Sequence, residues 1–62
     1  MKKKVIGISC GEKTDSFLPL QYVPTDYVEA VKIAGGIPLL IPFGNKKEIE
    51  DVLELCDGVI IT

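Results

Sequence analysis

The sequence predicts an α/β fold in which helices cover both faces of a parallel sheet. Three short segments are apolar at nearly every position: Val5–Ser9, Ile37–Ile41 and Val59–Thr62. A segment whose apolar residues repeat at helical spacing separates the first from the second, and another separates the second from the third. Apolar strands that alternate with single amphipathic helices are typical of a parallel sheet that is buried on both faces.

Residues 10 to 24 are predicted to form a loop. They show no hydrophobic periodicity, and they include Gly11, Pro19 and Pro24. Loops longer than ~12 residues are uncommon in compact domains and are more often functional or disordered. Because this loop follows the first strand, we expect it to overhang the carboxyl ends of the strands.

The first helix is expected to begin at Thr25, whose hydroxyl can accept a hydrogen bond from a first-turn amide and so cap the helix. Its apolar positions repeat at helical spacing: Tyr27, Ala30, Val31 and Ala34. Gly35 and Gly36 are expected to end it, because the residue after a helix commonly adopts the left-handed conformation that glycine tolerates.

The second helix is predicted to follow Asn45. Glu48 stands three residues later, as in a capping box. The apolar positions of this helix again repeat at helical spacing: Ile49, Val52, Leu53 and Cys56. Asp57 and Gly58 are expected to end the helix, so that the third strand follows at once.

Pro38 constrains the order of the strands. Proline cannot donate to a β ladder, so it belongs on an edge strand or at the start of a strand. Crossovers between parallel strands are almost always right-handed. The strand order 2-1-3 satisfies both rules and puts the two helices on opposite faces. This arrangement is the first β-α-β-α-β portion of a flavodoxin-like doubly wound sheet.

The composition excludes several classes of partner. Lys and Arg total 7, Asp and Glu total 9, and the two signs are intermixed. No nucleic acid or anionic membrane is therefore expected as a partner. The apolar run after Lys2–Lys4 is too short for a signal peptide, and no run approaches the ~20 apolar residues of a membrane span. We expect a cytoplasmic protein.

The two cysteines are expected to remain separate thiols. Cys10 follows the first strand and Cys56 precedes the third, so they lie at opposite ends of a parallel sheet. This separation, roughly 15 Å or more, exceeds the ~7 Å between Cα atoms that a disulfide allows. The sequence has no histidine, so no zinc site of the usual Cys/His type is expected. No metal or cofactor is predicted.

A ligand site is predicted at the carboxyl ends of the strands. In doubly wound sheets ligands bind where the strand order reverses, which here is between the first and third strands. The predicted rim consists of residues at or beyond those strand ends: Ser9, Cys10, Gly11, Tyr22 and Thr62. These residues are candidates for substrate contact, and no catalytic residue or metal ligand is predicted.

Cys10 is the most nucleophilic side chain at this rim. A catalytic thiol must be activated by a base or by the N-terminus of a helix. The chain has no histidine, and Cys10 precedes a predicted loop. We therefore interpret Cys10 as a small, half-buried hydrophobic residue and Cys56 as a core residue. The residues alone identify no reaction.

Three stretches together carry a family pattern. Val5–Ser9 reads VIGIS, Tyr27–Pro42 reads YVEAVKIAGGIPLLIP, and Cys56–Thr62 reads CDGVIIT. They resemble the IGI strand, the YV-x-AV-x-x-AGG-x-P helix–strand unit and the L-x-x-x-DG-x-x-x-TGG strand of the gamma-glutamyl-gamma-aminobutyrate hydrolase family. This family is of the class I glutamine amidotransferase-like type. The resemblance covers nearly the whole chain.

The resemblance implies that residues 1–62 are the N-terminal fragment of a single domain that hydrolyses gamma-glutamyl amide bonds. The family uses a cysteine nucleophile at a strand–helix elbow, with a histidine and a glutamate downstream. None of these three has a counterpart in the present sequence. In the family, two glycines follow the position of Thr62 and begin a loop expected to help form the oxyanion hole. The isolated chain is accordingly expected to be inactive.

Two other functions fit the same elements. The first half-domain of a periplasmic-binding-protein-like small-molecule sensor also opens with an IG strand and an amphipathic helix. The AGG-x-P join at Ala34–Pro38 favours the hydrolase, because such sensors usually have a single glycine and an aromatic residue there. The third interpretation is a free-standing module that binds a partner through an exposed edge strand.

The expected partners follow from these interpretations. The third strand needs a neighbour along its outer edge, either the remainder of the parent domain or another copy of the chain. The complete enzyme would bind a small gamma-glutamyl substrate.

Overall fold

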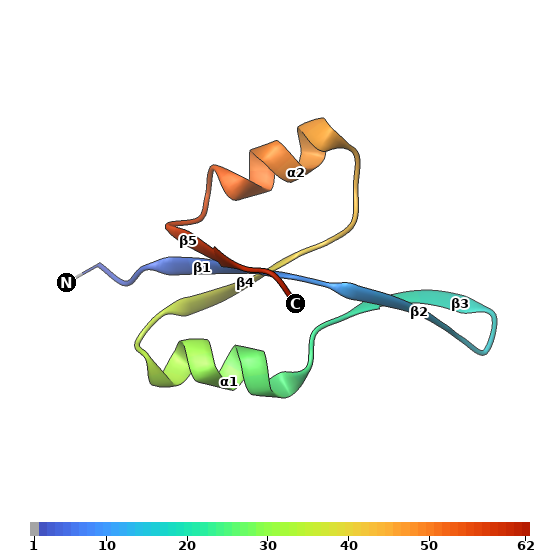
Figure 1. The fold of residues 1–62 in the computed structure, drawn as a ribbon, viewed down its shortest axis with the longest axis horizontal. Coiled ribbons are helices and arrows are strands. Elements are labelled where there is room, and N and C mark those ends of the chain that lie inside the picture. The colour runs from blue at the N-terminus through green and yellow to red at the C-terminus, as the bar shows by residue number, and fades with distance from the viewer. Residues whose placement is uncertain (1) are drawn as a thin grey trace.

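The computed structural model describes residues 2–62, and its α/β architecture agrees with the prediction (Figure 1). A parallel sheet is formed by β1 (Val5–Ser9), β4 (Ile37–Ile41) and β5 (Gly58–Ile60), in the order β4-β1-β5. This is the predicted order 2-1-3 when the parallel strands are counted along the chain. The helices α1 (Thr25–Ile33) and α2 (Lys46–Leu53) lie on opposite faces of the sheet.

Pro38 lies on an edge strand, as predicted. In the parallel register, Ile6 at the start of β1 is opposite Pro38 of β4 on one side and Gly58 of β5 on the other. An edge strand pairs along one side only, so a residue without an N–H group is tolerated there. β1 is therefore the central strand of the sheet, and the two helices lie on opposite faces of that sheet.

The predicted loop from residue 10 to residue 24 is wrong. Most of this segment forms an antiparallel hairpin of β2 (Gly11–Asp15) and β3 (Leu18–Tyr22), a two-stranded sheet of its own. The hairpin continues outward from the carboxyl end of β1 and projects away from the parallel sheet (Figure 1). It does not fold back over the strand ends as the prediction required.

The turn of the hairpin explains why it was not predicted. Ser16 and Phe17 connect the two strands, and both have positive φ, 49° and 70°. Positive φ at both central positions is typical of the type I′ hairpin turn, in which Asn-Gly is the usual pair. A bulky side chain in this conformation costs of order 1–3 kcal/mol. The segment therefore lacks the residues by which a hairpin turn is recognised.

The start of α1 also differs from the prediction. Pro24 occupies the N-cap position with an extended backbone, and Thr25 is already the first helical residue. Among the described residues no side chain caps this end. The Tyr27 N–H donates instead to the Pro24 carbonyl at 3.1 Å. Thr25 cannot serve as the cap because a capping residue must lie before the first helical residue.

The end of α1 is as predicted. Gly35 follows the C-cap residue and has a φ of 86°, a conformation that glycine adopts without a side-chain clash. The Gly35 N–H donates to the Lys32 carbonyl at 3.0 Å, and the Gly36 N–H donates to the Val31 carbonyl at 2.9 Å. These two bonds form a Schellman motif, which turns the chain directly into β4.

The capping box of α2 is confirmed. The Glu48 N–H donates to the Asn45 side chain at 2.9 Å, and the Asn45 N–H donates to the Glu48 carboxylate at 2.9 Å. The helix ends at Leu53, earlier than predicted, so Cys56 is not on it. Cys56 is nevertheless half-buried, and its Sγ donates to the Val52 carbonyl at 3.5 Å. Both helices of the described residues are too short to cross a membrane.

The described residues bury a small core. Four hydrophobic side chains are buried: Ile8, Cys10, Val31 and Ile41. Many other large apolar side chains remain exposed, among them Val59 and Ile61 in and after the outer strand β5. A core in a chain of this size rarely supplies more than ~3–5 kcal/mol of net stability. Further burial is therefore needed for a robust fold.

We expect the ordered structure to depend on chain concentration. Unpaired apolar edges invite association, and association would bury surface that one copy leaves exposed. The far-ultraviolet circular dichroism signal and the sedimentation coefficient should therefore increase together as the chain is concentrated. A dilute sample that is monomeric and unfolds cooperatively would contradict this expectation and would favour the free-standing-module interpretation.

Candidate functional site

Hydrogen bonds beyond the ladder hold β5 against β1 at its carboxyl end. The Thr62 N–H donates to Ser9 Oγ at 2.8 Å, and the Thr62 hydroxyl donates to the Ser9 carbonyl at 2.9 Å. The two hydroxyl oxygens are 3.3 Å apart. We call this pair the Ser9–Thr62 clasp. It brings two of the predicted rim residues together at the point where the strand order reverses.

A second pair of hydrogen bonds, in which each residue donates to the other, holds the amino end of the same strands. The Val5 N–H donates to the Asp57 carboxylate at 2.7 Å, and the Asp57 N–H donates to the Val5 carbonyl at 2.7 Å. β5 itself covers only Gly58–Ile60, shorter than the predicted Val59–Thr62. Side-chain hydrogen bonds thus continue the pairing at both ends of a three-residue strand. The sequence prediction treated Asp57 only as part of a helix end and missed this role.

Gly11 and Tyr22 form the base of the hairpin, where they are opposite each other in the antiparallel register. A Cβ atom added to Gly11 would lie 2.9 Å from Tyr22 Cζ, so only glycine lets the ring lie against the backbone. Lys13 Nζ lies 5.2 Å from the centroid of the Tyr22 ring, within the range of a cation–π interaction. Lys13 was not predicted, because its position beside Tyr22 follows only from the hairpin.

Gln21 connects the hairpin to the segment after β4. Its side-chain carbonyl accepts a hydrogen bond from the Phe43 N–H. The hairpin follows β1, Phe43 follows β4, and Thr62 follows β5. The Gln21–Phe43 bond and the Ser9–Thr62 clasp therefore connect the carboxyl ends of all three parallel strands.

Cys10 lies between the clasp and the hairpin. It is 8% exposed and lines an apolar cavity of about 220 Å³ together with Phe43, Ile49 and Ile61. A strand follows Cys10, not a helix, and the sequence has no histidine. Its surroundings are those of a buried hydrophobic residue. They include neither of the groups that activate a catalytic thiol.

The geometry resolves the predicted rim into three parts. Ser9 and Thr62 are hydrogen-bonded to each other, Gly11 and Tyr22 are in contact across the hairpin, and Cys10 is buried between the two pairs. These contacts hold the strand ends in place. Among residues 2–62 they do not assemble a nucleophile with a base.

The fold and this edge define a doubly wound α/β domain whose ligand site would lie at the carboxyl ends of its strands. Comparison with known protein families identifies the family to which the chain belongs. The family model described as Peptidase C26 matches residues 4–62. The chain belongs to this family, which is of the class I glutamine amidotransferase-like type.

One relative shows how much of a longer protein the chain matches. The chain is 32% identical, over 66 residues, to a glutamine amidotransferase-like protein of Rickettsia prowazekii (strain Madrid E). The aligned region covers 97% of this chain and 23% of the relative, so the chain spans about a quarter of the relative's length. No solved structure matches the chain.

Replacing Asp57 tests whether the pairing of β1 with β5 depends on its side chain. Asp57→Ala removes the acceptor of the Val5 N–H and should lower the free energy of unfolding by about 1 kcal/mol. Asp51→Ala is the matched control. It removes only a helix-surface ion pair with Lys47, worth roughly 0.2–0.5 kcal/mol. Urea unfolding of both variants at one fixed chain concentration measures the difference, and equal losses would contradict the assignment.

Titration with a thiol reagent tests the placement of the cysteines. Both thiols are free, Cys10 is buried, and Cys56 is half-buried. Under denaturing, non-reducing conditions we expect two reactive thiols. Under native conditions Cys56 should react faster than Cys10. Finding no reactive thiol in a denatured monomeric sample would mean that the strands are placed wrongly.

Proposed function

We propose that this chain is the N-terminal part of a cysteine-dependent hydrolase of gamma-glutamyl amide bonds. The observation that carries the proposal is the match of residues 4–62 to the Peptidase C26 family. The VIGIS, AGG-x-P and DG-x-x-x-T stretches narrow the resemblance to the gamma-glutamyl-gamma-aminobutyrate hydrolases. The substrate would be a small gamma-glutamyl amide. The family match also favours this function over the sensor.

The arrangement of the carboxyl edge supports this proposal. Acyl transfer requires donors held at a fixed position relative to the nucleophile, because a preorganised oxyanion hole stabilises the charge that develops in the transition state. The Ser9–Thr62 clasp fixes the backbone at Thr62, the position after which the family has its glycine-rich loop. The chain would thus supply a rigid base for that loop.

The nucleophile and its base are assigned to other parts of the domain. By resemblance they are a cysteine at a strand–helix elbow, a histidine and a glutamate, and the present sequence has no histidine. Here Ser9, Cys10, Gly11, Tyr22 and Thr62 would form part of the substrate-site rim. Their proposed role is to position the substrate and the neighbouring loop. They form and break no covalent bond of the substrate.

The proposal also assigns partners and a compartment. The remainder of the parent domain would pair with the outer edge of β5, whose Val59 is 41% exposed. Cys10 and Cys56 are both free thiols, which suits the reducing cytoplasm.

A chimera tests the proposal. Residues 4–62 would replace the matching region of the Rickettsia prowazekii relative, and hydrolysis of a gamma-glutamyl anilide would be measured for the chimera and for the intact relative side by side. We expect the chimera to be active and the isolated 62-residue chain to be inactive, since acyl transfer needs an activated nucleophile. Cys10→Ala in the chimera should leave the rate within about threefold, because a loss of catalytic chemistry costs far more.

Two results would overturn the proposal. One is a folded chimera that does not hydrolyse the anilide although the intact relative does. The other is turnover by the isolated chain that Cys10→Ala abolishes, which would make Cys10 the nucleophile.

A further inference from the structure

Lys13 places a positive charge beside the carboxyl edge of the parallel sheet. In the antiparallel register of the hairpin it is opposite Leu20, whereas Tyr22 is opposite Gly11, nearer the base. The Lys13 Nζ nevertheless lies 5.2 Å from the centroid of the Tyr22 ring, so the side chain leans back toward the base of the hairpin. Gly11 follows the last residue of β1, Ser9, by roughly 7 Å of extended chain. The ammonium group therefore lies just beyond the end of β1.

The aromatic ring that holds this charge is itself fixed. A Cβ atom on Gly11 would lie 2.9 Å from Tyr22 Cζ, so the ring lies directly against the backbone. Gln21, the residue before Tyr22, accepts a hydrogen bond from the Phe43 N–H and ties this end of the hairpin to the segment after β4. A charge held on a fixed ring is preorganised for a ligand, because little side-chain freedom is lost on binding.

The charge of Lys13 has no carboxylate partner within residues 2–62. The ion pairs of the described residues all lie on α2. Glu12 precedes Lys13 in β2, but successive side chains of a strand point to opposite faces. Asp15 shares the face of Lys13 and lies toward the tip, away from the direction in which the Lys13 side chain leans. An ammonium group has three N–H donors, so this one is available to an external carboxylate.

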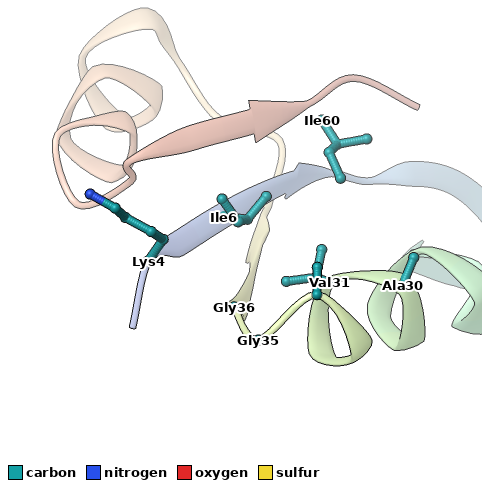
Figure 2. A pocket seen from close by; sticks show the side chains of 8 residues that line it. Lys4, Ile6, Ala30, Val31, Gly35, Gly36 and Ile60 are labelled. Carbon is teal, nitrogen blue, oxygen red and sulfur yellow. The ribbon is translucent and has the colours of Figure 1, made fainter. Parts of the chain in front are cut away.

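The position of Lys13 differs from that of the apolar surface that the chain leaves open. A groove of about 420 Å³ on the α1 face of the sheet is lined by Ile6, Val31 and Ile60 (Figure 2). In the proposed complete domain, further chain would cover this face, because doubly wound sheets are covered on both faces. The carboxyl edge, in contrast, is where such a domain binds its ligand. Completion of the domain would therefore leave Lys13 beside the ligand.

We propose that Lys13 is a specificity-determining residue that binds a carboxylate of the substrate. This role rests on the proposed hydrolase function, whose gamma-glutamyl substrates carry a free α-carboxylate away from the scissile amide. The Lys13 ammonium donates charge-assisted hydrogen bonds to a carboxylate, and the Tyr22 ring holds the ammonium in place. A carboxylate on the leaving amine has the same chemistry, and the choice of substrate distinguishes the two sources.

Kinetics of the chimera that carries residues 4–62 test the proposal. Lys13→Ala should raise KM about 10-fold and leave kcat nearly unchanged, because the lost contact is made equally in the ground state and the transition state. Lys13→Arg keeps the charge and should keep KM near that of the unaltered chimera. Lys32→Ala is the matched control, since Lys32 is an exposed lysine in the last turn of α1, where the chain leads into the amino end of β4. It removes the same charge and should leave KM unchanged.

Three substrates locate the carboxylate that Lys13 binds. They are a gamma-glutamyl anilide, the same anilide with a carboxylate on its ring, and a gamma-aminobutyryl anilide, which lacks the α-carboxylate. Binding of the α-carboxylate predicts that Lys13→Ala raises KM equally for the first two. Binding of the leaving-group carboxylate predicts an effect on the second alone. Either result supports the proposal, and KM for the third substrate should not respond to Lys13→Ala.

A failure of the hydrolase function is distinguishable from a failure of the Lys13 assignment. A folded chimera without hydrolysis overturns the function. Calorimetry with gamma-glutamyl-aminobutyrate, which carries both carboxylates and which an inactive chimera cannot consume, then tests Lys13 alone. Lys13→Ala should weaken this binding about 10-fold. A shorter chimera that carries only residues 9–23 is measured in parallel, so that the test does not depend on the folding of the longer one.

Three results would overturn the assignment of Lys13. One is a Lys13→Ala variant whose KM for all three substrates and whose affinity for gamma-glutamyl-aminobutyrate equal those of the unaltered chimera. Another is a fall in kcat without a rise in KM, which would indicate a disturbed catalytic centre. The last is an equal rise in KM for Lys32→Ala, which would indicate an effect of net charge.

Discussion

The pairing of β1 with β5 is the interaction on which the rest of the structure depends. Without β5, β1 would become an edge strand, and the reversal of strand order at which the candidate ligand site is predicted would not exist. Yet the ladder covers only Gly58–Ile60. The Asp57 carboxylate at one end and the Ser9–Thr62 clasp at the other supply the missing hydrogen bonds. The side chains at the two strand ends therefore help to hold β5 beside β1, and this pairing makes β1 the central strand.

The uncovered surfaces of the chain have two separate consequences. The outer edge of β5 has free backbone groups, and a further strand is the partner that satisfies them. The open apolar groove on the α1 face of the sheet, by contrast, is lined by side chains such as Ile6 and Val31, and any apolar surface packed over it would bury them. The edge of β5 thus needs a hydrogen-bonding backbone, whereas the groove needs only apolar surface.

Local signals predicted the parallel part of the fold well. β1 and β4 have the predicted bounds, Gly35 ends α1 through its positive φ, and Asn45 with Glu48 forms the predicted capping box. Each of these features depends on residues close together in the sequence. The hairpin was missed because Ser16-Phe17 is not one of the residue pairs typical of a two-residue turn, and because the contacts at its base join residues far apart in the sequence. The clasp was missed because it joins residues 53 positions apart.

The sequence predicted that Ser9 and Thr62 lie at one edge of the sheet, but it did not predict the hydrogen bonds between them. Strand order alone places Ser9 and Thr62 at the same edge, whereas their mutual hydrogen bonds depend on where β5 stops. A hydroxyl both donates and accepts, so each of these residues can bind the other's backbone and still contact the other's side chain. Valine in place of Thr62 would keep the shape and lose the donated bond. The polar character of this strand end is therefore explained by the positioning of the backbone at Thr62.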